Sequence, residues 1–334
     1  MYFLISDCLA RLSAPDIARV RLASMLAILV CGLVSGYLAS TRFGLPERFA
    51  KKIMTIVLVC LNWPIALFVI WSMRLTEELI WLPIVGVVSM LAITALSTVL
   101  FSFFELDRRS RLTLILAGSL SNMGYTGGAF VCYALFGAAG LALANLYPVF
   151  WLPTVYLTFF PLLKIQELRK KDSKAKFRLS KVLDFRFLVL PAVITAIVLN
   201  LTDIESPAFI RKFYIIDILV YTASALSFFA IGLRVKLSRL KNYIDLYFPL
   251  AVVKFILTPV LALVIIWLLA MTGQNLNSLV QKVIIVLSAT PSAVLMVTMS
   301  NVFNLDGPLA SALWVATTAI FAAIVVPALF FILT

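Results

Sequence analysis

The chain is organised as long apolar runs separated by short polar segments. Most runs contain about 20 residues, which is the length an α-helix needs to cross the hydrocarbon core of a bilayer. A soluble protein would have to stack these runs as helices with almost no polar face. The pattern therefore predicts an all-α membrane protein with ten spans, at approximately 22–40, 53–73, 79–101, 113–137, 140–162, 186–203, 214–233, 246–270, 279–303 and 308–332.

Two of the predicted spans have a polar, interrupted centre. Residues 121–130, SNMGYTGGAF, interrupt the fourth span, and residues 288–293, SATPSA, interrupt the ninth. A broken helix leaves unpaired backbone groups, which cannot face lipid and need a partner, a cavity or a solute. A half-helix that begins there presents a positive dipole end, which suits an anion. Either interruption alone could reflect ordinary tolerance of Gly and Pro, but their matching places favour a binding site.

Composition and charge agree with a membrane protein and set its orientation. The 334 residues are 63% hydrophobic, and the mean hydropathy is +1.08. The net charge of +13 does not indicate nucleic-acid binding, because the basic residues lie in short loops where they determine topology. Most of the 28 Lys and Arg residues follow odd-numbered spans. We therefore expect these loops to be cytoplasmic and both termini to be external.

The longest polar stretch divides the chain into two halves. Residues 163–185 are expected to form a basic cytoplasmic linker rather than a regulatory site, between five-span halves at 22–162 and 186–334. Because five is odd, the halves cross the membrane in opposite senses, as inverted repeats of secondary transporters do. Residues 1–21 are expected to be an interfacial segment, because their apolar start is too interrupted for a cleaved signal peptide.

Several classes of chemistry are disfavoured. The chain has no histidine, which excludes histidine-based catalysis, proton relays and metal ligation. Its four cysteines, Cys8, Cys31, Cys60 and Cys132, have no metal-like spacing, and the three in apolar runs are expected to be buried. Without paired intramembrane carboxylates or a nucleophile–base pair, we predict no enzyme, no cofactor and no metal. A channel is disfavoured because no filter motif is visible.

Five segments together resemble the auxin efflux carrier family, which includes plant auxin carriers and permeases for malonate-like acids. They are SGYLASTRFGLPERFAKKIMTIVLVCLNWPIALF (35–68), SNMGYTGGAF (121–130), LSFFAIGLRV (226–235), VVKFILTPVL (252–261) and the stretch that begins TPSAVLMVTMSNVFN (290–318). The resemblance implies the fold of bile-acid/sodium symporters, with two inverted five-helix repeats and crossed, broken spans 4 and 9. It also implies that spans 1, 2, 6 and 7 form a scaffold, against which the other spans move like an elevator.

The chain departs from the family pattern at several polar positions. Ser121 stands where the family usually has Gly, and Ala129 where it often has Pro. Leu295 replaces a frequent Asn, and Ser300 and Asn304 replace common small residues. These differences mark a divergent member and argue against borrowing a substrate from relatives.

The first interruption supplies most of the candidate substrate-binding residues. Asn122 matches the crossover Asn of the family, and its amide can donate and accept hydrogen bonds or cap a half-helix. Gly124 and Gly127 would let the backbone approach a ligand. Tyr125 and Thr126 either line a pocket or pack between helices.

The second interruption and the second span add further candidates. Pro291 removes a backbone donor and should break the ninth span. Thr290 and Ser292 either bond freed backbone carbonyls or meet a solute. Asn62 either faces the substrate path or bonds the backbone freed by Pro64.

Three charged residues are candidates for coupling. Lys254 lies inside the eighth span, where it could attract an anion, assist proton coupling or extend to the interface. Asp217 begins the seventh span and Asp306 follows the ninth; each is a proton site or an interfacial residue. Trp63 and Trp151 are expected to pack or to anchor the interface.

The sequence thus predicts a secondary transporter in the lipid bilayer of a bacterial inner membrane. The expected substrate is a small organic anion such as a carboxylate, moved outward by elevator-type alternating access. Proton coupling or the membrane potential is favoured over sodium coupling, because clustered acidic residues are absent near the interruptions. The alternative is a receptor or regulator on the same scaffold without transport. The sequence leaves homodimer formation open and indicates no nucleic-acid partner.

Overall fold

The computed structural model describes residues 14–73, 75–151, 153–155, 157–159, 163, 189–234 and 241–333. Within these ranges the chain forms helices and one isolated antiparallel bridge, with no strand. Most of the expected interfacial segment 1–21, and nearly all of the linker 163–185, lie outside the described residues. Cys8 also lies outside them.

Among the described helices, three are π-helices. The N-terminal half contains α2 (Ala14–Phe43), α3 (Glu47–Ile56), η1 (Val57–Asn62), α4 (Trp63–Trp71), η2 (Glu77–Ile80), α5 (Trp81–Ser102), α6 (Arg108–Ser119) and α7 (Gly128–Leu146). The C-terminal half contains α9 (Val189–Leu201), α10 (Ala208–Lys212), α11 (Ile215–Gly232), α12 (Ile244–Val252), η6 (Val253–Leu257), α13 (Thr258–Met271), α14 (Ser278–Ser288), α15 (Val294–Val302), α16 (Gly307–Ile320), η7 (Phe321–Val325) and α17 (Val326–Leu333).

Seven helical stretches in the described chain are long and apolar enough to cross a membrane, fewer than the ten predicted spans. Six of them coincide with predicted spans 1, 2, 3, 7, 8 and 10. The seventh, Gly128–Leu146, joins parts of spans 4 and 5 and has a kink at Gly137, whose φ of 65° and ψ of −151° are not helical. Predicted spans 6 and 9 contain shorter apolar helices, because span 9 is interrupted and, in the described part of span 6, the helix runs over 189–201.

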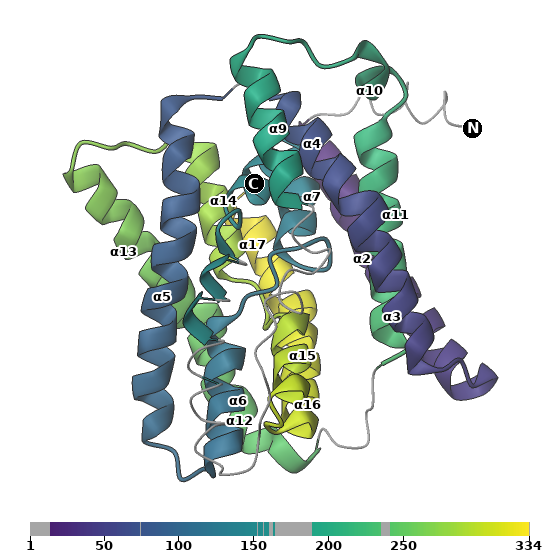
Figure 1. The fold of residues 1–334 in the computed structure, drawn as a ribbon, viewed down its shortest axis with the longest axis vertical. Coiled ribbons are helices and arrows are strands. Elements are labelled where there is room, and N and C mark those ends of the chain that lie inside the picture. Colours follow the sequence, from purple (N-terminus) through teal and green to yellow (C-terminus); the bar gives the residue numbers. More distant parts are fainter. Residues whose placement is uncertain are drawn as a thin grey trace.

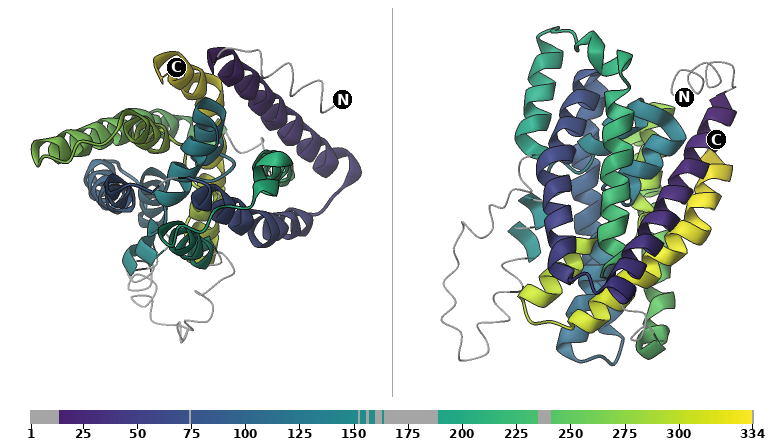
Figure 2. Two further views of the ribbon diagram at one scale, coloured as in Figure 1. Left: turned by 90° about the horizontal axis from the view of Figure 1, so that it is seen from above. Right: turned by 90° about the vertical axis from the view of Figure 1, so that its right-hand side faces the viewer.

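The long helices pack in two groups. In one group α2 packs along α11, and α4 packs along α9. In the other, α5 packs on α6 and α13, while α16 packs on α6, α12 and α15. Figure 1 shows α5 and α13 on one side of the molecule and α2, α3 and α11 on the other, and the view from above in Figure 2 agrees. α7 contacts helices of both groups, including α2, α4 and α14, and so lies between them.

The contact between α2 and α11 depends on small residues. A Cβ atom on Gly36 would lie 2.1 Å from the Phe229 carbonyl oxygen, and one on Gly232 would lie 2.3 Å from the Leu33 carbonyl oxygen. Both neighbours are backbone atoms, so no side-chain movement could relieve the clash. Close approach through glycine is a common way for helices to associate in membranes.

Each π-helix ends two residues before a proline. η1, η6 and η7 precede Pro64, Pro259 and Pro327 respectively. Proline lacks the N–H that an α-helix uses and clashes with the carbonyl four residues earlier. A local π-turn re-pairs the freed groups, so the helix continues through the proline. As a result, these prolines modify the three helices without ending them.

Candidate functional site

The two predicted interruptions lie together in the structure. α6 ends at Ser119 and α14 ends at Ser288, and the extended segments after them run antiparallel through a bridge between Ser121 and Ser292. The backbone N–H of Asn122 donates to the Pro291 carbonyl at 2.8 Å, and that of Ala293 donates to the Leu120 carbonyl at 2.9 Å. The two breaks therefore pair their freed backbone groups with each other, which satisfies them away from lipid.

A tight turn in the first interruption redirects the chain into α7. The Asn122 carbonyl accepts a hydrogen bond from the Gly128 N–H at 2.9 Å. A Cβ on Gly127 would lie only 2.1 Å from that carbonyl oxygen, so no side chain fits there. Gly128 in turn packs against Leu287 and Thr290. The turn therefore depends on glycine at positions 127 and 128. It does not depend on a proline at position 129, where this chain has Ala129.

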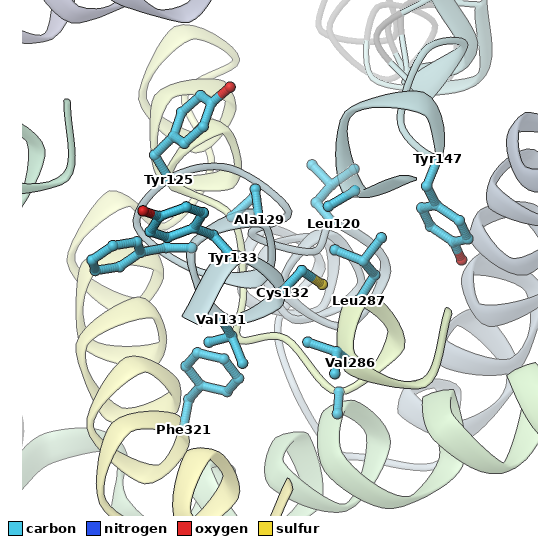
Figure 3. Close-up of a cluster of buried hydrophobic side chains, with 14 of the residues drawn as sticks. Leu120, Tyr125, Ala129, Val131, Cys132, Tyr133, Tyr147, Val286, Leu287 and Phe321 are labelled. Atoms are coloured by element: carbon cyan, nitrogen blue, oxygen red, sulfur yellow. The ribbon is translucent and has the colours of Figure 1, made fainter. Parts of the chain in front are cut away.

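Apolar side chains hold the start of α7 against α14. Figure 3 shows Leu120, Cys132 and Leu287 clustered there, and all three are fully buried. The expectation of buried cysteines is correct for Cys132 and wrong for Cys31 and Cys60, which are exposed. Both lie on helices that the structure leaves uncovered at those positions, where lipid rather than protein can surround a small apolar side chain.

A cavity of about 270 Å³ lies beside the crossing segments. Its apolar walls include Met54, Val57, Met123, Trp151, Val294 and Leu295. Its polar side chains are uncharged and come from Asn62, Ser121, Asn122, Tyr125, Thr126, Asn145 and Ser227. No charged side chain is among the described residues that line it. The arrangement suits a small amphipathic solute, because apolar walls with a few polar groups are typical of ligand sites.

Two polar pairs order the wall formed by the first interruption. The Asn122 side-chain amide donates to the Thr126 hydroxyl at 3.0 Å. The Tyr125 hydroxyl donates to Asn145 Oδ1 at 3.0 Å, and the Tyr125 carbonyl accepts from the Ser224 hydroxyl at 3.0 Å. Tyr125 and Thr126 therefore have partners within the wall and also line the cavity. Asn122 lines the cavity as well, but its side chain bonds Thr126 and does not cap α7.

The N-terminus of α15 opens onto the same cavity. Val294 and Leu295 line it, and no described residue accepts a hydrogen bond from their backbone N–H groups. The first amides of α7 differ, because the N–H groups of Gly128 and Ala129 donate to the Asn122 and Met123 carbonyls. The sequence predicts two helix N-termini with free amides at the crossing, whereas among the described residues only that of α15 has them. Free amides and the helix dipole at α15 favour a negatively charged group.

The candidates from the second interruption do not line the cavity. The Thr290 hydroxyl donates to the Leu287 carbonyl at 2.8 Å, and the Ser292 hydroxyl donates to the Ala117 carbonyl at 2.8 Å. Pro291 contributes its carbonyl to the pairing with Asn122. Thr290 and Ser292 thus bond backbone carbonyls, the first of the two alternatives, because both face the helix ends that they join. Gly127 likewise shapes the turn without lining the cavity.

Asn62 and Lys254 approach the cavity from other helices. Asn62 lines it from η1, and its side chain, including the buried Oδ1, forms no hydrogen bond with another described residue, so it does not bond the backbone freed by Pro64. Lys254 lies on η6 and is fully buried. Its ammonium donates to the Ser121 hydroxyl oxygen at 2.5 Å. The alternative in which Lys254 extends to the interface is wrong, since its side chain points to the crossing.

The acidic candidates lie elsewhere. Asp217 is half-buried and accepts a hydrogen bond from the Tyr133 hydroxyl, and the Arg21 guanidinium lies 5.4 Å from the Tyr133 ring centre. Asp306 caps α16 by accepting from the Leu309 N–H at 3.0 Å and also accepts from the Ser110 hydroxyl. Neither carboxylate lines the cavity.

Sequence reasoning did not select three polar residues of the cavity as candidates and underrated one aromatic residue. Ser121, Asn145 and Ser227 line it, as does Trp151, which was expected only to pack or to anchor the interface. Asn145 stands in the apolar run LALANLYPVF, and an isolated amide in such a run is a usable signal. Ser227 had no comparable signal, because membrane helices commonly contain serine at packing positions.

Apolar helices of spanning length, with two interrupted segments paired beside a cavity, define a polytopic helical membrane protein. A family model described as "Membrane transport protein" matches residues 21–330, so the chain belongs to this family of membrane transporters, the auxin efflux carrier family. None of the curated proteins compared with the chain matches it.

Proposed function

We propose that the protein is a secondary transporter that exports a small organic anion, such as a carboxylate, through the cavity at the crossing. The observation that carries this proposal is the start of α15, where Val294 and Leu295 line a cavity with uncharged polar and apolar walls and their amides have no partner among the described residues. A carboxylate can accept from both amides, and its apolar part can contact the walls.

The size of the cavity restricts the solute. A volume of about 270 Å³ lies near the lower end of the range of about 300–1,000 Å³ that is usual for small-molecule pockets. This favours an anion with few carbon atoms, such as a short-chain or single-ring carboxylate.

The packing supports movement of one helix group against the other. The cavity has walls from η1 and α11, in the group of α2, and from the crossing segments and α15, in the group of α5. Relative movement of the groups could therefore expose a bound solute on either side. We propose that the groups correspond to the scaffold and the moving domain of an elevator, built from two inverted five-helix repeats.

The ends of the helical part support the proposed topology. The start of α2 and the end of α17 lie toward the same end of the molecule in Figure 2. This placement supports an even number of crossings, such as the ten spans proposed. We propose that both termini are external, that the 163–185 loop is cytoplasmic, and that the protein resides in a bacterial inner membrane.

Transport of labelled carboxylates by proteoliposomes tests the proposal. We expect uptake of radiolabelled benzoate or butyrate in liposomes that contain the protein and none in empty liposomes. Asn122→Ala should lower the rate at least tenfold, because its amide orders the cavity wall. Asn301→Ala is the matched control, since Asn301 is exposed and lies outside the cavity.

Two results would contradict the proposal in different ways. If neither these acids nor other small anions are moved, transport of an organic anion is excluded. If the acids bind with the expected sensitivity to Asn122→Ala but show no flux, the protein is a receptor or regulator on the same scaffold.

A further inference from the structure

Lys254 is a cation buried within the membrane part of the protein. Its side chain is 0% exposed and lies on η6, between α12 and α13. Its ammonium donates one hydrogen bond, to Ser121 Oγ at 2.5 Å. An ammonium has three donors, so this contact uses only part of its capacity.

The charge of Lys254 has no opposite charge nearby in the described chain. Among the described residues, no carboxylate forms an ion pair with it, and the cavity has no charged side chain in its wall. A buried, unpaired charge is expensive within a membrane protein and normally has a partner. The partner of Lys254 is therefore to be sought in a group that enters the site.

Ser121 connects Lys254 to the cavity. It lines the cavity while its oxygen accepts the hydrogen bond from Lys254. Its own hydroxyl proton has no acceptor among the described residues, so it remains available to a solute. The bridge to Ser292 fixes its backbone. A chain from ammonium to hydroxyl to anion strengthens each hydrogen bond through polarisation.

We propose that Lys254, acting through Ser121, supplies the counter-charge for the transported anion, and that the site accepts a solute with one negative charge. Within the proposed transport function, on which this inference rests, the substrate class is then a monocarboxylate. A dicarboxylate would place its second charge against uncharged walls. Lys254 is a positioning and charge-compensating residue, since it reaches the solute through Ser121.

Three probes with the same four-carbon chain separate charge from shape: butyrate, its neutral analogue butyramide, and the dianion succinate. Competition with labelled butyrate uptake in proteoliposomes measures the apparent affinity of each. In the unchanged protein we expect butyrate to bind at least tenfold more tightly than either butyramide or succinate.

Two variants locate the charge. Lys254→Met should lower the apparent affinity for butyrate roughly 100-fold, as expected for loss of a unit charge about 5 Å from the anion. The apparent affinity for butyramide should not change. Ser121→Ala should weaken butyrate roughly tenfold through loss of the connecting hydroxyl. Thr258→Val and Ser119→Ala are matched controls, because both remove buried hydroxyls that bond backbone carbonyls outside the cavity.

Equal affinity for butyrate and succinate would overturn the inference and leave transport intact. An equal loss of apparent affinity for butyrate and for butyramide in Lys254→Met would also overturn it, because a structural role of Lys254 would affect both affinities. If Lys254→Met is not monodisperse after purification, Ser121→Ala decides, and an unchanged ratio of butyrate to butyramide affinity refutes the inference. If no carboxylate is bound or moved by the unchanged protein, the proposed function itself fails.

Discussion

The turn at Gly127 offers a quantitative test of how the crossing is built. In Gly127→Ala the new Cβ would lie 2.1 Å from the Asn122 carbonyl oxygen, more than 1 Å inside an ordinary contact. The Asn122 carbonyl oxygen accepts from the Gly128 N–H at 2.9 Å, and the Asn122 N–H donates to the Pro291 carbonyl at 2.8 Å. Displacing it would leave a buried group unpaired, which costs about 1–3 kcal/mol, and overpacking adds a similar amount.

We therefore expect Gly127→Ala to lower the free energy of unfolding by about 2–6 kcal/mol and to abolish transport. The matched control is Gly124→Ala in the same turn, where a Cβ meets no atom within 4 Å. Its unfolding free energy should stay within about 1 kcal/mol of the unchanged protein. Fluorescence-detected thermal unfolding in detergent compares the two. A Gly127→Ala protein with an unchanged midpoint would refute the account of the turn.

Three further predictions concern single polar groups. Asn62→Leu should leave the unfolding midpoint unchanged or raise it, because the substitution removes a buried oxygen without a partner among the described residues. It should nevertheless lower benzoate uptake at least tenfold, because Asn62 lines the cavity. A lower unfolding midpoint would contradict this prediction. Tyr125→Phe should reduce the free energy of unfolding by about 1 kcal/mol through loss of the 3.0 Å bond to Asn145, and no change in denaturant stability would count against it. Hydrogen bonding from Ser110, together with the backbone N–H of Arg109, lowers the pKa of Asp107 from its ordinary value. The stability from this carboxylate is therefore present above the unfolded-state pKa and is lost as the pH falls through the lower folded-state pKa. Acid unfolding of Asp107→Asn should lack this component, and acid profiles that coincide with those of the unchanged protein would exclude it.

The existence of the crossing could be predicted from the sequence, whereas its register could not. Two interruptions at matching places in the two halves indicated that the freed backbone groups would need partners. The pairing of individual backbone groups depends on how two segments about 170 residues apart are positioned relative to each other along the helix axes. The periodicity of each helix does not encode this relative position. This is why Thr290 and Ser292 were considered together with Asn122, although they face helix ends and Asn122 faces the cavity.

Helix boundaries were predictable where apolar runs end in polar residues, and less so where only the backbone conformation changes. Asp107 and Asn277 mark the starts of α6 and α14 by capping, which their residue types favour. The kink at Gly137 lies inside a continuous apolar stretch, and its positive φ is a backbone property that composition does not reveal. Pro64 indicated freed backbone groups, but not that a π-turn would carry the helix through.

Lys254 shows why a buried charge is hard to assign from one helix alone. It lies about eight residues into the predicted eighth span, or about 12 Å along the helix, so a long side chain could have reached the interface. Its direction depends on the rotation of η6, and its partner, Ser121, comes from the other half of the chain. Ser121 itself departs from the family motif, in which glycine is usual. A glycine there would leave the ammonium without this hydrogen bond. In the proposed site, the serine is the route by which the buried charge would act on a cavity whose described lining residues carry no charge.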